Sequence, residues 1–122
     1  MKIQLTLAEG KYLVTGYGPG WIEINKERHD ANLILTPDQL SPWGATSIEE
    51  LTAEHLEPVV KLAPDVVLIG SGDRLKFPSP ALLRPLIEAG IGFEVMITAA
   101  ACRTYNVLMA DGRNVAMALI IS

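Results

Sequence analysis

The stretch "DVVLIGSGDRLKFPSPALLRPLIEAGIGFEVMI", Asp65–Ile97, decides the fold class. It begins with an apolar run over 65–70, continues with a helical pattern over 79–90 and ends in a β-rich run over 93–97. A strand, a helix and a strand in this order are typical of a parallel or mixed sheet whose strands are joined by crossover helices. The stretch therefore predicts an α/β fold.

The same rhythm continues on both sides of this stretch. Helical patterns cover 51–62 and 98–112, and a final apolar run covers 115–121. The runs over 65–70 and 115–121 are apolar at successive positions, as expected for strands that are covered on both faces. These patterns extend the predicted sheet by one strand and two helices.

The expected helix ends carry the usual signals. Ser79 followed by Pro80 predicts an N-cap and a first helical residue, and Thr98 is expected to cap the next helix. Gly90 and Gly112 stand where these two helices should end.

Short strands fill the first half of the chain, up to Trp43. The β-rich segments are 3–7, 12–18, 21–25 and 32–37. Gly, Pro, Asn and Asp separate them, which favours an antiparallel meander, and "GYGPG", Gly16–Gly20, predicts a hairpin turn. We therefore expect one three-layer α/β domain over residues 1–122. It combines N-terminal antiparallel strands with a mixed sheet and crossover helices, and is superficially Rossmann-like.

Composition excludes several classes of protein. The chain has 122 residues, a hydrophobic fraction of 49%, a net charge of -4 and a single cysteine. No basic run suggests nucleic-acid binding, and no apolar run approaches the roughly 20 residues of a membrane span. The first residues lack the apolar core of a secretory signal, and one cysteine cannot form an internal disulfide. We expect a cytoplasmic protein that does not bind nucleic acid or insert into a membrane.

The loop that follows residues 65–70 is the first candidate site. Its candidate binding residues are Gly70, Ser71, Gly72, Arg74 and Lys76. Open α/β sheets bind ligands at the carboxyl ends of strands, and two basic side chains there would neutralise an anion. The glycine spacing fits neither a P-loop nor a dinucleotide motif, so a strand-to-helix turn with solvated charges is the favoured interpretation and a ligand or partner site is the alternative. Phe77 is expected to anchor this loop to the core.

The start of the helix over 98–112 is the second candidate site. Its candidate residues are Thr98, Cys102, Arg103 and Asn106. The helix N-terminus and a neighbouring arginine both favour a thiolate, so Cys102 is a candidate nucleophile. Neither histidine is placed to act as its base, and a small packed core residue is the alternative role for this cysteine. Helical spacing puts Cys102 and Asn106 on one face, where they would line a shallow cleft.

The other motif searches are negative. One cysteine and two distant histidines give no close pair of metal ligands, and the carboxylates are scattered. The sequence lacks a G-x-S-x-G nucleophile elbow. We predict no metal, no cofactor and no catalytic residue beyond the candidate thiol, and therefore favour a protein that is not an enzyme.

Residues 66–120 closely resemble the domain of unknown function 498 family, which includes the mitochondrial respiratory complex I assembly factor 3 proteins. The resemblance is carried by "GSGDR", "FPSP", "GIGFEVM" and "TAAACRTYN". The positions that match the recurrent pattern of the family are Gly70, Gly72, Arg74, Phe77, Pro78, Cys102, Thr104, Tyr105 and Asn106. The resemblance implies a three-layer α/β fold with no established enzymatic activity, and it assigns no catalytic role to these residues.

Two functions of different classes follow. The favoured one, implied by the resemblance, is a non-catalytic binding or assembly protein with a protein partner, respiratory-complex subunits among the candidates. The alternative is a small-molecule, anion-binding protein or a thiol-dependent enzyme that uses the loop Gly70–Lys76 and Cys102. The short strands of the first half also favour a homodimer.

Overall fold

The computed structural model describes residues 10–121, so the strand expected over 3–7 lies outside the described residues. The strands are β1 (Val14–Gly18), β2 (Trp21–Ile24), β3 (Glu27–His29), β4 (Leu33–Leu35), β5 (Leu40–Pro42), β6 (Val66–Gly70), β7 (Gly92–Met96) and β8 (Val115–Leu119). The helices are α2 (Ala53–Lys61), α3 (Arg84–Glu88) and α4 (Thr98–Ala110), and a 3-10 turn, η1 (Pro80–Leu83), leads into α3.

The predicted mixed sheet is confirmed. Its five strands have the order β5-β4-β8-β6-β7. β6 pairs in parallel with both β7 and β8, and β4 pairs antiparallel with β8 and β5. All five residues of β8 and four of the five of β6 are buried, as the continuous apolar runs predict.

The first half of the chain divides between two sheets. β1, β2 and β3 form a separate antiparallel sheet, in which β1 and β2 make the expected hairpin at "GYGPG". The prediction of one continuous meander is wrong for 32–37, because β4 is buried at all three positions and pairs with β8 in the main sheet. A strand at Glu27–His29 was not expected, since its charged residues do not alternate with apolar ones.

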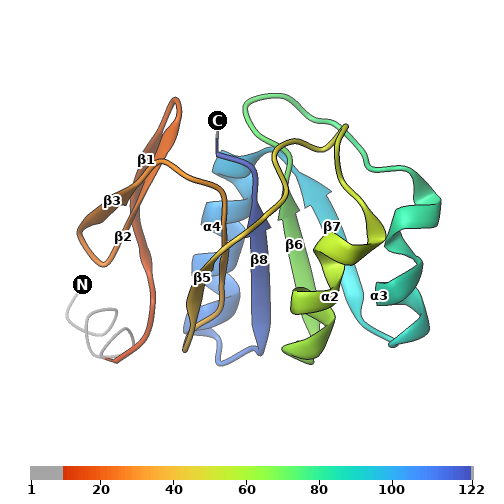
Figure 1. Cartoon of the computed structure of the whole chain (residues 1–122). Coiled ribbons are helices and arrows are strands. Elements are labelled where there is room, and N and C mark those ends of the chain that lie inside the picture. The colour runs from red at the N-terminus through yellow and green to blue at the C-terminus, as the bar shows by residue number, and fades with distance from the viewer. Residues whose placement is uncertain (1–9, 122) are drawn as a thin grey trace.

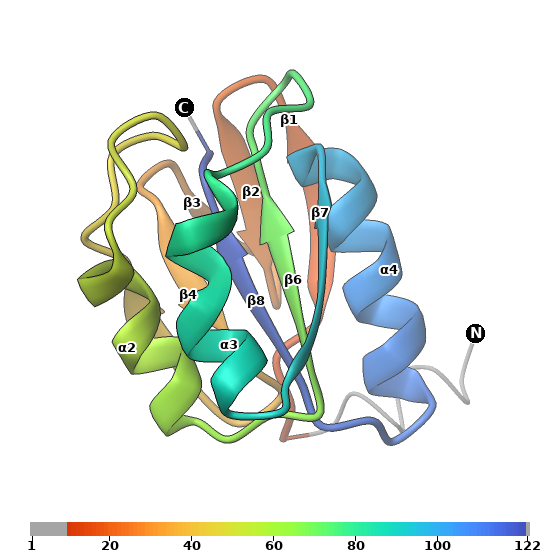
Figure 2. The ribbon, with the colours of Figure 1, turned by 90° about the vertical axis from the view of Figure 1, so that its right-hand side faces the viewer.

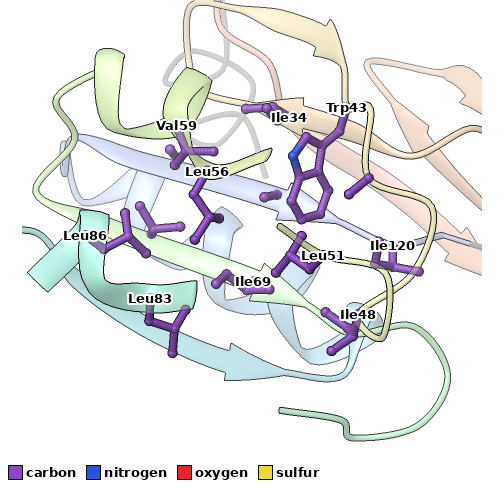
Figure 3. Packing of buried hydrophobic residues seen from close by; sticks show 14 of the residues in the cluster. Ile34, Trp43, Ile48, Leu51, Leu56, Val59, Ile69, Leu83, Leu86 and Ile120 are labelled. Atoms are coloured by element: carbon purple, nitrogen blue, oxygen red, sulfur yellow. The ribbon is translucent and has the colours of Figure 1, made fainter. Parts of the chain in front are cut away.

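The main sheet has a hydrophobic core on each face. Figure 2 shows α2 and α3 on one side of the sheet and α4 on the other. The first core joins β6 and β8 to α2 and α3, with Leu56, Val59 and Leu86 fully buried. Figure 3 shows these side chains together with Trp43, whose indole Nε1 donates a hydrogen bond to the carbonyl of His55 at 2.9 Å.

The second core lies between α4, the main sheet and the small sheet. It contains Ile22 and Ile24 of β2, Leu68 of β6 and Tyr105 of α4, each with at most 2% of its surface exposed. The small sheet therefore packs beside α4 and completes the three layers (Figure 1).

Candidate functional site

Ser71 forms hydrogen bonds inside the loop that follows β6, residues 71–78 (the β6 loop). The Ser71 hydroxyl donates a hydrogen bond to the carbonyl of Arg74 at 2.6 Å and accepts one from the Lys76 N–H at 3.3 Å. Ser71 is only 5% exposed. Its side chain is therefore used to hold the turn and is not free to meet a ligand.

Thr98 ties this β6 loop to α4 and β8. Its hydroxyl donates to the carbonyl of Ile120 at 2.6 Å and accepts from the Gly72 N–H at 2.9 Å, while the Thr98 N–H donates to the carbonyl of Gly72 at 2.9 Å. The expectation that Thr98 is an N-cap is wrong, because the cap position is Ile97 and the Thr98 side chain bonds to neighbouring segments.

Gly70 is required by packing between the strand and the helix. A Cβ at this position would meet the side chain of Leu119, and would lie 2.9 Å from the Thr98 hydroxyl oxygen. Such distances are too short for any side chain larger than hydrogen. The first glycine of the signature thus lets β6, β8 and the start of α4 approach one another.

Apolar side chains of the β6 loop point outward. Leu75 is 54% exposed and Phe77 is 68% exposed. The expectation that Phe77 anchors the loop is wrong, and the neighbouring Pro78 is the buried residue. The loop therefore presents two large apolar side chains to its surroundings.

The two basic residues of the loop differ in their partners. Arg74 is exposed, whereas the ammonium of Lys76 lies 2.8 Å from the carboxylate of Glu49. The hydrogen bond from Lys76 holds the pKa of Glu49 below its usual value. Lys76 is therefore already paired with a carboxylate, which leaves Arg74 as the other exposed cation of the loop.

Cys102 lies on the inner face of α4 and is fully buried. Burial raises the pKa of its thiol to about 12, although the nearby charge of Arg103 acts in the opposite direction. A thiol with this pKa is almost entirely protonated at neutral pH, and a buried one is inaccessible to substrate. The structure thus supports the packed role for this cysteine.

Arg103 and Asn106 connect α4 to the small sheet. The Arg103 guanidinium donates a hydrogen bond to the Tyr17 hydroxyl at 2.9 Å. The Asn106 amide accepts from the Val14 N–H at 3.0 Å and donates to the Val14 carbonyl at 2.8 Å. The Asn106 side chain therefore pairs with the N–H and carbonyl of Val14 in the way that the backbone of a neighbouring strand would.

An open cleft of about 420 Å³ lies between the β1–β2 hairpin and the start of α4. Its lining residues are Tyr17, Gly18, Pro19, Gly20, Trp21, Ile22, Gly72, Asp73, Ile97, Thr98, Ala99 and Ile121. Gly72 and Thr98 are the predicted site residues that it contains, while Arg74, Cys102 and Asn106 lie outside its lining. The observed cleft therefore lies beside the β1–β2 hairpin, and not beside Cys102 and Asn106 as expected.

Metal ligands do not gather in residues 10–121: no group of three or more His, Cys, Asp or Glu side chains there could hold an ion. In the same part of the chain, no helix has both the length and the apolar character needed to cross a bilayer.

The exposure of Leu75 and Phe77 was not predicted from the sequence. Leu75 and Phe77 lie in a loop rich in charge and proline, and their outward orientation leaves no periodic signal. Glu49 and Tyr17, the partners of Lys76 and Arg103, are far away in the sequence. Contacts of this kind depend on the folded chain.

Together, these features define an α/β domain in which a mixed sheet and a small antiparallel sheet enclose one helix, and a hydrogen-bonded loop follows β6. The chain belongs to the family described as "Protein of unknown function (DUF498/DUF598)", whose model matches residues 14–120.

Known proteins resemble the chain in both fold and sequence. A solved structure from Bordetella parapertussis is 39% identical, with a TM-score of 0.88, and the match covers 93% of this chain and 98% of that one. The protein named "NADH dehydrogenase [ubiquinone] 1 alpha subcomplex assembly factor 3" from Drosophila melanogaster is 35% identical over 88% of this chain and 58% of its own length. The protein of the same name from Xenopus tropicalis is 29% identical over 98% of this chain and 66% of its own length. The chain thus spans less than two thirds of the length of these two assembly-factor relatives.

Proposed function

We propose that the protein is a non-catalytic assembly factor that binds subunits of a respiratory NADH dehydrogenase, with the β6 loop as its docking surface. The relatives that carry the assembly-factor name support the class of partner. The loop is part of the sequence shared with the family.

The exposed pair Leu75 and Phe77 is the observation that carries this proposal. Large apolar side chains more than half exposed are costly to leave in water, and aromatic residues on a rigid support are common anchors of protein interfaces. Ser71 and Thr98 hold the loop in place from below, so little conformational entropy is lost on binding. A preformed loop with apolar side chains suits a protein surface better than it suits an anion.

The alternative functions have less support. Cys102 is buried and protonated, and Lys76 is already paired with Glu49. The polar groups of Ser71, Thr98 and Asn106 are engaged in hydrogen bonds within the fold. These side chains of the predicted thiol or anion site therefore have structural roles, and Arg74 is an exposed cation without a built pocket around it among the described residues. A cytoplasmic location stays a prediction.

Affinity capture from the native host tests the proposal. The tagged wild-type chain is expected to enrich subunits of NADH dehydrogenase, identified by mass spectrometry after mild detergent extraction. Phe77→Ser combined with Leu75→Ser should abolish this enrichment. Val107→Ser is a matched control, because Val107 on α4 is 67% exposed, close to the 68% of Phe77. Wild-type capture without these subunits, or equal capture by the loop variant, would contradict the proposal.

A further inference from the structure

One edge of the main sheet is open to a further strand. β7 is the last strand in the order of the sheet, and it pairs only with β6 among the described residues. The Met96 carbonyl accepts a hydrogen bond from the Ser71 N–H, so Met96 faces β6 with its backbone. Backbone groups alternate between the two sides of a strand, and those of Phe93 and Val95 therefore point away from the sheet.

The other sheet edges are protected. Asn106 occupies both the N–H and the carbonyl of Val14 on the outer side of β1. β3 has only three residues, two of them charged, and β5 has three residues that end in Pro42. Capping side chains, charges, shortness and proline are the usual devices that keep an edge from pairing.

β7 has little of this protection. It is five residues long, contains no proline and carries one charge, Glu94. Phe93 and Val95 are half-buried against the core on the α2 and α3 side, while Glu94 is exposed on the other face and makes no ion pair with the described residues. The edge thus offers hydrogen-bonding groups and a single unpaired carboxylate.

We propose that an extended segment of the partner protein adds to the main sheet alongside β7, with a lysine or arginine opposite Glu94. This inference rests on the proposed function and names the contact. Strand addition takes its affinity from main-chain hydrogen bonds and its specificity from side chains at alternate positions. The carboxyl end of β7 adjoins the start of the β6 loop through the Ser71–Met96 hydrogen bond, so one partner can reach both.

A second copy of this chain is a poorer occupant. Two β7 strands paired antiparallel would bring both Glu94 carboxylates onto one face of a short ladder, directly opposite or diagonal, where like charges destabilise pairing. Figure 1 also shows α3 beyond β7, outside the edge of the sheet. A symmetric partner would bring its own α3 toward this helix, whereas an isolated strand would bring no helix with it.

A peptide probe tests the inference without requiring the natural partner. The capped peptide Ser-Thr-Val-Lys-Val-Thr-Ser is added to the full chain, and amide exchange is followed by NMR. At saturation the amides of Phe93 and Val95 should exchange about tenfold more slowly or better, because they become hydrogen-bonded. A peptide with glutamate in place of the lysine should act more weakly, and Glu94→Lys should reverse this preference.

Val95→Pro supplies a second test. The Val95 N–H points outward, so proline removes no bond to β6 but prevents strand addition. No slowing with either peptide, equal slowing with both, or an unchanged preference in Glu94→Lys would overturn the inference. Capture of NADH dehydrogenase subunits by both wild type and Val95→Pro would leave the proposed function standing and refute strand addition. Slower exchange with the peptide, without capture of the subunits by wild type, would support strand addition and refute the proposed function.

Discussion

The β6 loop and the inner face of α4 contain the two most recognisable motifs of the sequence, and the folded chain uses them in opposite ways. On α4, Cys102 and Asn106 are turned toward the core or bonded to β1. In the loop, Leu75 and Phe77 are turned outward. Polar residues of a shared motif can thus serve the fold, while its apolar residues remain available for recognition.

Loss of the Asn106 amide should give the largest effect. Asn106→Leu leaves both the N–H and the carbonyl of Val14 without a partner, and we expect a loss of about 3 kcal/mol in the free energy of unfolding. Urea denaturation measures this change in the free energy of unfolding. Asn114→Ala is the control, because its exposed bond to the Ala63 carbonyl is long at 3.2 Å. Equal effects of the two substitutions would show that Asn106 is not a structural bridge.

Removal of the Thr98 hydroxyl comes next. Thr98→Val keeps the shape of the side chain but leaves the Gly72 N–H and the Ile120 carbonyl unpaired, which should cost about 2 kcal/mol. Thr104→Val is the matched control, since the Thr104 hydroxyl bonds only within α4 and to a methionine sulfur. A Thr98→Val protein with unchanged stability would mean that the hydroxyl is free for a ligand.

The buried Cys102 thiol should make the folded chain less stable at alkaline pH. The pKa of Cys102 is about 12 in the folded chain and near 9 when exposed, so between these values the unfolded chain binds fewer protons than the folded one. The contribution of the protonated thiol to the free energy of unfolding is complete below about pH 9. It is lost as pH rises, by up to about 1.4 kcal/mol per pH unit. Burial also raises the pKa of Tyr105, which adds to this loss.

Urea denaturation at about pH 8 and about pH 10 compares wild type with Cys102→Ala, and the variant should lose about 1 kcal/mol less over this interval. The wild-type thiol should also react with an alkylating reagent only after unfolding. Rapid alkylation of the native chain would show that Cys102 is accessible and would contradict its packed role.

The ion pair beside the loop should give the smallest effect. Lys76→Ala removes the hydrogen bond that holds the pKa of Glu49 down, so this pKa should rise toward its ordinary value in an NMR titration. Both groups are exposed, and we expect no measurable change in melting temperature. A marked fall in melting temperature would show that the pair stabilises the loop.

The order of strands and helices from Leu51 onward could be predicted because long apolar runs and helical spacing are local signals. The placement of β4 in the main sheet could not, because pairing with β8 joins residues more than 80 positions apart. At the candidate site, the position of the loop after β6 was predicted and the binding roles of its glycines stay a prediction, but the direction in which Phe77 points was not predicted. That direction depends on which residue of the loop is buried, here Pro78.

The most direct test compares stability and partner capture in the same two variants. Leu75→Ser with Phe77→Ser is expected to keep the wild-type free energy of unfolding to within about 0.5 kcal/mol and to lose capture of NADH dehydrogenase subunits. Thr98→Val is expected to lose about 2 kcal/mol of that free energy and, while folded, still to capture the subunits. Capture that survives in the loop variant but disappears in folded Thr98→Val would contradict the division between an outward docking loop and an inward structural helix.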